Sequence, residues 1–374
     1  MSVVYLDHAA TTPLAPAARE AMLPYLDEFY GNASEPHAAG RQARAGLEEA
    51  RRAVADLLEA KPGQVVFTSG GTEADNQAVL GLAGDSPGRL VVSAIEHPAV
   101  REPALALERR GFEVAWAPVD RSGVVDVEAL RRLVQPGDRL CAVMWANNVT
   151  GAIQPVAEVA EVCAAVGVPL HVDAVQAAAS LPVGLRSPGA ETMALSAHKL
   201  HGPKGVGCLL ARDPRRVPPL ILGGGQEHGL RSGTENVAGV VGFAAALAAG
   251  RSADDERRAH RELLEQSLPP GVRVVSAHAE RLPGHALLLV DGIRAELLVL
   301  ALDRAGFAVA AGSACASGEA EPSHVLTAQG MSEGDARSVI RVSLGLETTA
   351  EQVRAFANAL AACAAQLERG ALAS

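Results

Sequence analysis

The sequence predicts an α/β fold, with a mainly parallel sheet in a large domain and a smaller α+β domain after it. Strand-like apolar runs alternate with helical patterns through the first 250 residues, which is typical of a parallel sheet covered on both faces. The chain has 374 residues, 48% of them hydrophobic, which is enough for two cores of unequal size. Near residue 251 the composition becomes densely charged, so we place the domain boundary there.

The first 250 residues contain the elements of the large domain. The segment 35–60 has a helical period, and its apolar face holds Ala43, Leu47, Val54 and Leu58. A short β-rich run at 64–69 precedes a glycine-containing loop and a helical stretch to about residue 81. A helix at 127–134 follows a candidate N-cap at Asp126. Further strands are predicted at 89–95, 114–118, 140–146, 169–173, 192–196 and 205–210.

The remaining residues predict a smaller unit of strands and helices. Residues 251–262 are densely charged and are predicted to form a solvated helix that links the two domains. A loop at 310–318 is rich in Gly, Ser and Ala, and Thr348 and Glu351 have capping-box spacing at the start of the last helix. The other elements predicted here are strands at 272–276, 286–290 and 340–344 and a helix at 295–305.

Composition excludes several classes of function. The formal net charge is -10 and no block of Lys and Arg stands out, which argues against nucleic acid or an anionic membrane as the main partner. No signal-peptide pattern is visible, and the longest apolar stretch, 237–249, is too short to span a bilayer. The five cysteines are widely spaced and form no C-x-x-C pair, which favours reduced thiols over a disulfide framework or a structural zinc site. We therefore expect a soluble, cytoplasmic protein.

Two segments have the form of ligand loops beside strand ends, where open α/β sheets bind their ligands. In 68–73, small residues including Gly71 and Thr72 sit between a strand and a helix, and backbone N–H groups there could hold a phosphate. The alternative is a tight turn without a ligand. Asp173 ends an apolar run, and its carboxylate could pair with a ring nitrogen or could cap a helix.

Lysine is scarce, which limits any chemistry that needs a side-chain amine. The candidates are Lys61, Lys199 and Lys204. Lys199 follows a predicted strand, and a buried lysine is costly unless it reacts, for example by forming a Schiff base with an aldehyde. Lys204 precedes Gly205 and has the setting of a turn lysine, while Lys61 precedes Pro62 at a solvated helix end. We therefore favour Lys199.

Three further residues have a chemical and a structural interpretation. Cys315 lies among small residues in the loop 310–318, where it is either a thiol that reaches a substrate or an ordinary loop cysteine. His97 follows a strand and either stacks on a cofactor or is a surface or capping group. Arg341 is a charge inside an apolar run, and it either pairs with a structural acid or holds a substrate carboxylate.

Together and in order, these motifs resemble those of cysteine desulfurases of the nitrogenase- and iron–sulfur-cluster-associated type, within the class V aminotransferase-like family. Three departures remove no catalytic group: Val149 at a position usually acidic, the pattern of 31–37, and Ala311 and Ala316 in place of common hydroxyl residues around the cysteine. The matching segments spread over nearly the whole chain: 5–13, 67–76, 96–97, 147–148, 171–173, 196–205, 231–234, 312–317 and 340–345.

The resemblance implies a fold-type I pyridoxal-phosphate-dependent transferase that works as a homodimer. Residues 1–15 would pack with the small domain, 16–250 would form the large cofactor-binding domain, and 251–374 would form the small domain that carries the Cys315 loop. No resident metal is implied, although Cys315 would transiently contact a nascent iron–sulfur cluster.

The resemblance also implies a role for each site residue. Lys199 would hold pyridoxal 5'-phosphate as a Schiff base, His97 would stack on its ring, and Asp173 would pair with its ring nitrogen. Arg341 would hold the substrate carboxylate with Asn148 and Asn32. The other cofactor-binding positions are Gly71, Thr72, Asn148, Gln176, Ser196, Ala197, His198 and, from the other subunit, Thr234.

The activity implied by the resemblance is removal of sulfur from L-cysteine. Lys199 would move the Cα proton, and Cys315 would attack the substrate sulfur, leaving L-alanine and a persulfide on Cys315. The sulfur would pass to an iron–sulfur scaffold or another acceptor protein. Alternatives are a selenocysteine lyase, which would use the same residues, an aminotransferase, which would need no cysteine, and a non-catalytic partner in cluster assembly.

Overall fold

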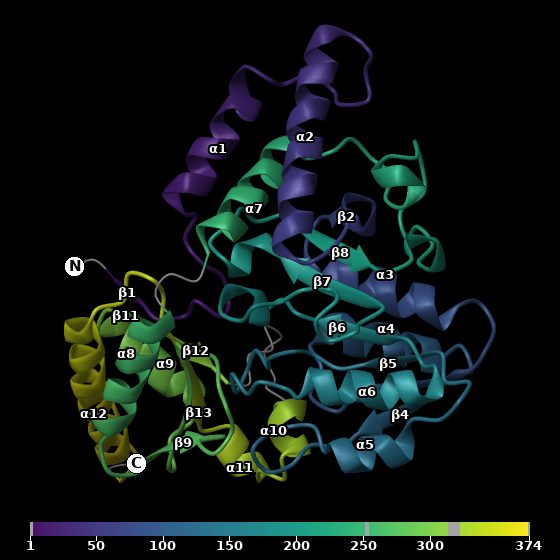
Figure 1. The fold of residues 1–374 in the computed structure, drawn as a ribbon. Helices are drawn as coiled ribbons and strands as arrows, with labels where there is room; N and C mark the ends of the chain where they lie inside the picture. Colours follow the sequence, from purple (N-terminus) through teal and green to yellow (C-terminus); the bar gives the residue numbers. More distant parts are fainter. Residues whose placement is uncertain (1–2, 251–253, 313–321, 373–374) are drawn as a thin grey trace.

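The computed structural model describes residues 3–250, 254–312 and 322–372 (Figure 1). In this part of the chain the largest sheet has seven strands in the order β2-β8-β7-β6-β5-β3-β4. Strands β3 to β7 pair in parallel, whereas β8 is antiparallel to both of its neighbours. Their bounds are β2 Val65–Thr68, β3 Arg89–Ser93, β4 Glu113–Ala117, β5 Leu140–Ala142, β6 Leu170–Asp173, β7 Thr192–Ser196 and β8 Gly207–Ala211. The prediction of a mainly parallel sheet is confirmed.

Helices cover both faces of this sheet, as parallel strands require, because each crossover needs a connecting element. On one face, α3 (Gly71–Ala83) and α4 (Pro98–Glu108) bury apolar side chains against β3 and β5. On the other face, α5 (Val127–Leu133) and α6 (Val156–Val166) contribute to the largest core cluster. The predicted cap of α5 is confirmed, since Asp126 accepts a hydrogen bond from the Ala129 N–H.

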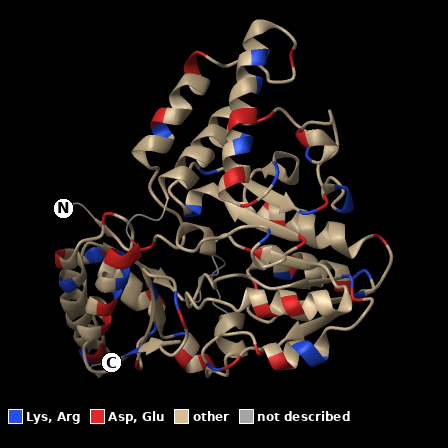
Figure 2. Cartoon of the chain, viewed as in Figure 1, with Lys and Arg blue, Asp and Glu red and all other residues tan. Residues whose placement is uncertain are grey.

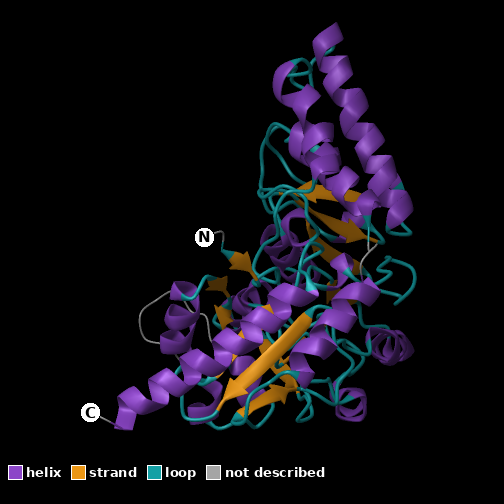
Figure 3. Cartoon of the chain, turned by 90° about the vertical axis from the view of Figure 1, so that its left-hand side faces the viewer, coloured by secondary structure: helices purple, strands orange, loops and turns teal. Residues whose placement is uncertain are grey.

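A layer of three helices stands above the large sheet, visible at the top of Figures 1 and 3. These are α1 (Pro16–Asp27), α2 (Ala38–Leu57) and α7 (Val237–Ala249). The face predicted for α2 is buried. No single helix in residues 3–250, 254–312 and 322–372 is long and apolar enough to cross a membrane; α7 and α8 (Asp254–Gln266) pass that test only as a bent pair.

The small domain has its own sheet, in the order β12-β13-β10-β9 and antiparallel throughout. Its strands are β9 Val272–Val275, β10 His285–Val290, β12 Ala310–Ala311 and β13 Val339–Ser343. Helices α8 (Asp254–Gln266), α9 (Ala295–Arg304) and α12 (Ala350–Leu372) pack on it around a separate core. Two short helices, α10 (His324–Ala328) and α11 (Glu333–Ala336), connect β12 to β13.

Three details of the small domain differ from the sequence predictions. Helix α8 is not a solvated linker, because Arg257, Arg261 and Leu264 on it are buried. The two buried arginines contact hydroxyl, carbonyl and carboxylate oxygens, and these contacts offset the cost of burying their charges. The loop predicted at 310–318 begins as strand β12, and residues 313–321 with Cys315 lie outside the described residues.

The capping box of α12 is displaced by one residue from the prediction. Thr349 and Gln352 exchange the two hydrogen bonds, Thr349 N to Gln352 Oε1 at 3.0 Å and Gln352 N to Thr349 Oγ1 at 3.2 Å. The hydroxyl of Thr348 instead accepts from the Gly345 N–H. Both threonines satisfy the same spacing rule, so only the register of the chain distinguishes them.

The N-terminal segment lies against the small domain. Strand β1 (Val4–Tyr5) pairs in parallel with β11 (Phe307–Ala308), and Leu6 is buried in the small-domain core. In the described part of the chain, basic and acidic residues are interspersed over the helices of both domains (Figure 2). The segment after β1 then crosses to the large domain, which brings both domains to one cavity.

Candidate active site

A cavity of about 360 Å³ lies at the carboxyl ends of β6 and β7, beside the N-termini of α3 and α4. This is where parallel sheets place ligands, because strand ends and helix N-termini converge there. The lining comes from segments far apart in the sequence: Ala9, Ala10, Gly71, Thr72, Asp75, His97, Met144, Asn148, Asp173, Val175, Gln176, Ser196, His198, Lys199 and Arg341.

Lys199 stands at the centre of this lining, at the end of the short turn that follows β7. Of the three lysines, all described, Lys61 and Lys204 are exposed. The Lys199 Nζ donates to the carbonyls of Ala9 and Ala10 at 2.6 and 2.9 Å. Burial, followed by the positive charge of Arg341, lowers the pKa of Lys199 to about 8. A half-buried amine with a lowered pKa is suited to attack an aldehyde near neutral pH.

Asp173 is the last residue of β6 and is 5% exposed. Its Oδ1 accepts a hydrogen bond from the Val175 N–H at 2.9 Å in the loop after β6. The short helix that follows, 177–179, has Gln176 at its N-cap, so the prediction that Asp173 caps a helix is wrong. Burial raises the pKa of Asp173, while the charges of His97 and Lys199 lower it. A buried carboxylate in the cavity wall would be stabilised by a cationic ring nitrogen, which is the second interpretation from the sequence.

His97 fulfils its structural interpretation while also lining the cavity. It is the N-cap of α4, and its Nδ1 accepts from the Ala99 N–H at 3.1 Å. This bond fixes the ring plane and leaves Nδ1 unprotonated. Burial lowers the pKa of His97, which favours the neutral ring. A neutral, fixed imidazole can stack on a flat cofactor.

The N-terminus of α3 forms an anion site with the end of β7. Gly71 opens the helix, and a Cβ at this position would lie 2.5 Å from Val175 Cγ2, so only glycine fits without displacing the cavity wall. Thr72, Ser196 and His198 line the same side of the cavity. The free N–H groups of a first helical turn, hydroxyls and an imidazole together match a phosphate group.

Arg341 enters the cavity from the small domain, on strand β13. Its Nη2 donates to Asp7 Oδ1 at 2.7 Å and its Nη1 donates to the Asn148 carbonyl at 3.0 Å. Arg341 Nε is buried and has no hydrogen-bond partner among the described residues. The alternative of pairing with a structural acid therefore holds, and the guanidinium still has donors for a ligand in the cavity.

The remaining predicted residues lie in four kinds of position. Gln176 lines the cavity, and its Nε2 donates to the Ala9 carbonyl at 2.9 Å. Ala197 is buried beside Ser196, whereas Asn32 and Thr234 are exposed and do not line the cavity of this chain. Cys315 lies outside the described residues, so its distance from Lys199 is not defined by the structure.

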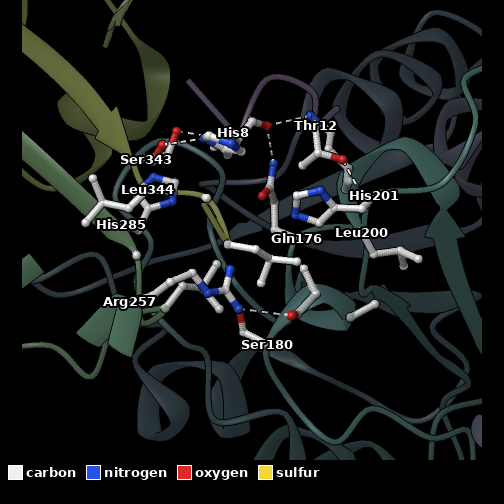
Figure 4. A pocket seen from close by; sticks show the side chains of 18 of the residues that line it. His8, Thr12, Gln176, Ser180, Leu200, His201, Arg257, His285, Ser343 and Leu344 are labelled. Atoms are coloured by element: carbon white, nitrogen blue, oxygen red, sulfur yellow. Dashed lines mark hydrogen bonds between the residues drawn. The ribbon is translucent and has the colours of Figure 1, made fainter. Parts of the chain in front are cut away.

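Figure 4 shows a second, smaller cavity of about 50 Å³, which Gln176 also lines. His8, Thr12, His201, Arg257 and His285 line it, with Ser343 and Leu344 from the end of β13. It shares Ala9, Gln176 and Lys199 with the larger cavity. Its volume suits one or two water molecules rather than a cofactor, so we assign ligand binding to the larger cavity.

The chain has clear relatives among known proteins. The model of the family described as aminotransferase class-V matches residues 4–356. This chain belongs to the class-V aminotransferase family. A cysteine desulfurase from Gluconacetobacter diazotrophicus is 43% identical over 360 residues, which cover 93% of this chain and 90% of that protein. An IscS-like cysteine desulfurase from Mycobacterium tuberculosis is 41% identical over 389 residues, covering 100% and 99%.

Solved structures place this family member in the same fold. A NifS-like protein matches with a TM-score of 0.90 at 34% identity, covering 98% of this chain and 99% of that one. A structure of SspA in complex with cysteine matches with a TM-score of 0.83 at 32% identity, covering 91% and 98%. The expected fold type I, with a large and a small domain in one subunit, is therefore confirmed for this chain.

The sequence analysis did not single out two buried carboxylates near the cavity, those of Asp75 and Glu96. Asp75 on α3 hydrogen-bonds His171 Nε2 at 3.1 Å, and Glu96 accepts from the Met144 N–H at 2.7 Å. Burial and the charge of Asp173 raise the pKa of Asp75, and they raise the pKa of Glu96 to about 8. Asp75 could have been found from the sequence, because it is a charged residue on the face of α3 that is otherwise apolar and buried.

The four described cysteines are all buried: Cys141, Cys163, Cys208 and Cys363. Burial raises the pKa of the Cys208 and Cys363 thiols, and the hydrogen bond with Cys163 followed by burial raises that of Cys141. Since the thiolate is the nucleophile, these cysteines are unsuited to attack a substrate. Of the described residues, no group of three or more His, Cys, Asp or Glu could hold a metal ion.

Proposed function

We propose that this protein is a pyridoxal-phosphate-dependent cysteine desulfurase, which removes sulfur from L-cysteine and releases L-alanine. Its relatives over nearly the whole chain are cysteine desulfurases. The single structural observation that carries the proposal is the setting of Lys199, a half-buried amine in a cavity that also holds Asp173 and the N-terminus of α3. An amine, a buried carboxylate and an anion site are the three contacts that this cofactor needs.

The residues in the cavity fit the cofactor at each of its functional groups. Lys199 would bind the aldehyde carbon, Asp173 the ring nitrogen, and His97 one face of the ring. Asn148 and Gln176 would contact ring substituents. The phosphate would lie against Gly71, Thr72, Ser196, Ala197 and His198. When bound, pyridoxal phosphate supplies an electron sink for the bonds at the substrate Cα.

Three side chains then act on the substrate: Arg341 binds its carboxylate, Lys199 moves its Cα proton and Cys315 attacks its sulfur. Arg341 holds the carboxylate of L-cysteine with its remaining N–H groups, which orients the Cα over the cavity. Lys199, with a pKa of about 8, is partly unprotonated near neutral pH and can take the Cα proton. The Cys315 thiolate forms a bond to the substrate sulfur as the bond from that sulfur to Cβ breaks. Cβ takes a proton and Lys199 returns a proton to Cα, so the products are L-alanine and a Cys315 persulfide.

The experiment that tests this function is the stoichiometry of the reaction. Purified protein loaded with pyridoxal phosphate receives L-cysteine, and alanine and sulfide are measured with and without a thiol reductant. We expect one alanine per sulfur, with sulfide appearing only when the reductant cleaves the persulfide. Alanine production without added sulfur on Cys315 by peptide mass would contradict the persulfide route. Transfer of the amino group to a 2-keto acid at a higher rate would favour an aminotransferase.

We also propose that the protein is a homodimer in which Thr234 completes the phosphate site of the other subunit. Thr234 is exposed and follows a loop with exposed apolar side chains, Leu220, Ile221 and Leu222. Further exposed apolar groups on and after α1 are Leu23, Leu26 and Tyr30. Burying such side chains against a second copy would stabilise a dimer. A light-scattering mass of one chain, with full activity, would contradict this proposal.

The sulfur on Cys315 would finally pass to an acceptor protein, which we propose is an iron–sulfur scaffold or another thio-cofactor pathway protein. Several relatives carry the name IscS, such as a cysteine desulfurase from Dictyoglomus turgidum, 40% identical over 360 residues. Incubating the persulfide form with a candidate scaffold and following the labelled sulfur tests this step.

A further inference from the structure

The N-terminal segment contacts both domains at the cavity, and Asp7 is its link to Arg341. The ion pair between Asp7 Oδ1 and Arg341 Nη2 is 2.7 Å long, and the side chains are 20% and 11% exposed. Arg341 and Asn148 line the cavity, whereas Asp7 does not. Asp7 therefore holds the guanidinium from outside the space that a substrate would fill.

The backbone of Asp7 is itself fixed by the strand that carries Arg341. The Ser343 N–H donates to the Leu6 carbonyl at 2.8 Å, and the His8 N–H donates to the Ser343 carbonyl at 3.2 Å. These bonds flank Asp7 and set it beside β13. The Tyr5 hydroxyl also donates to the Asp7 carbonyl at 3.0 Å. The Asp7 carboxylate is thus a preorganised anchor, rather than a flexible surface group.

The same segment continues to the amine end of the cavity. Two residues after Asp7, the Ala9 carbonyl accepts from Gln176 Nε2 and from Lys199 Nζ, and Figure 4 shows Gln176 pointing toward this stretch between His8 and Thr12. The Ala9 N–H is held by the Ser343 hydroxyl at 2.9 Å. The segment is therefore anchored at both ends of the site, which restricts movement of Asp7 relative to Lys199.

We propose that Asp7 is a positioning residue that aims the Arg341 guanidinium at the carboxylate of the amino-acid substrate. A guanidinium has five N–H donors in a rigid plane, and Asp7 and Asn148 take one each from Nη2 and Nη1. Two partners fix the plane and leave the other donors for a two-pronged contact. The inference rests on the proposed function, since it assigns the Arg341 ligand as the carboxylate of that substrate.

If Asp7 positions Arg341, its removal should weaken the binding of carboxylate ligands alone. A merely structural ion pair would not produce this difference between ligands. Without Asp7, the long Arg341 side chain gains rotamer freedom and must be ordered by each ligand that it binds. Ligands with a carboxylate should therefore bind more weakly. Amines without a carboxylate do not use Arg341 and should bind as before.

The test compares Asp7→Ala with Asp7→Asn in protein loaded with pyridoxal phosphate. L-alanine and ethylamine are titrated separately while the cofactor absorbance is followed. We expect Asp7→Ala to weaken L-alanine binding about tenfold, the loss typical of one charge-assisted hydrogen bond, and to leave ethylamine binding unchanged. Asp7→Asn keeps an oxygen acceptor for Nη2 and should recover most of the affinity. KM for L-cysteine should rise in Asp7→Ala by more than kcat falls.

A matched control is Asp291→Ala in the same domain. Asp291 pairs with Arg273 Nη2 at 2.8 Å, but both residues are far more exposed and neither lines the cavity. This variant should change neither titration. Thermal melting shows whether each variant is folded, and Asp7→Glu, which moves the carboxylate by one methylene, replaces Asp7→Ala if the latter does not fold.

Two results would overturn the proposal on Asp7 alone: wild-type affinity for L-alanine in Asp7→Ala, or equal losses for L-alanine and ethylamine. Selective loss in Asp7→Glu counts as support, and unchanged binding in that variant counts against. If wild-type protein does not respond to L-alanine at all and does not convert L-cysteine, the proposed function fails and the inference fails with it.

Discussion

The two ends of the cavity are built differently. At the cofactor end, Asp173, Ser196 and Gly71 are buried and belong to strand ends and a helix start of one sheet. At the substrate end, Arg341 comes from the other domain and is held by Asp7 and by the Asn148 carbonyl. The first end is rigid because local secondary structure sets it. The second depends on contacts between domains, so substitutions there should affect ligand choice more than cofactor attachment.

The largest loss of activity is expected from a substitution at the cofactor end of the cavity. Lys199→Ala removes the amine that binds the aldehyde, so covalent attachment of pyridoxal phosphate should be lost completely. Sulfide release should fall at least about a hundredfold, because the group that moves the Cα proton is also gone. Borohydride reduction followed by peptide mass measures the attachment. A label retained on Lys61 or Lys204 would show that Lys199 was assigned wrongly, and Lys204→Ala is the matched control.

Removing the Cys315 thiol should stop sulfur transfer while leaving cofactor attachment and substrate binding intact. Cys315→Ser should keep the cofactor attached and should still bind L-cysteine, because neither step uses the thiol. Sulfide release should be lost, since a hydroxyl is a far weaker nucleophile toward sulfur. Peptide mass after cysteine treatment should show added sulfur on the Cys315 peptide of the wild type. Cys363→Ala is the control, because Cys363 is buried in the small-domain core. Wild-type sulfide release in Cys315→Ser would favour direct elimination.

A smaller effect should follow from removing one charge at the cofactor end. Asp173→Asn keeps the size and the hydrogen bond from the Val175 N–H but loses the negative charge. Turnover should fall on the order of a hundredfold, as for loss of one electrostatic contact in an active site. KM for L-cysteine should change little, because Arg341 at the other end is untouched. A large rise in KM with unchanged kcat would place Asp173 at the substrate end instead.

The smallest expected effect is on the pH dependence of cofactor attachment, which depends on the lowered pKa of Lys199. Burial and Arg341 lower its pKa from 10.5 to about 8, so the neutral amine should become available as pH rises through about 8. The rate of covalent attachment to cofactor-free protein should rise up to that pH and then level. A denatured sample should keep rising toward about pH 10, the ordinary range for lysine. A folded profile that still rises steeply above pH 9 would contradict the burial argument.

Elements with a strong local pattern could be predicted from the sequence. Strand β7 agrees with its predicted bounds, and the Asp126 cap lies where the sequence placed it. Helix α8 could not be predicted correctly, because its charged residues look solvated until their partners in other segments are known. The cap of α12 failed for a related reason, since Thr348 and Thr349 have equivalent spacing and only the turn at Gly345 distinguishes them.

The sequence by itself determined the chemistry of the site: three lysines, a carboxylate at a strand end, a glycine at a helix start and an arginine in an apolar run. Each signal is local, because strand ends and helix starts are set by a few neighbouring residues. Only the tertiary structure decided how these groups combine. It placed Asp7 on Arg341, 334 residues away in the chain, and buried Asp75 and Glu96 near Asp173. Such pairings depend on how the two domains and the N-terminal segment pack, which no local pattern encodes.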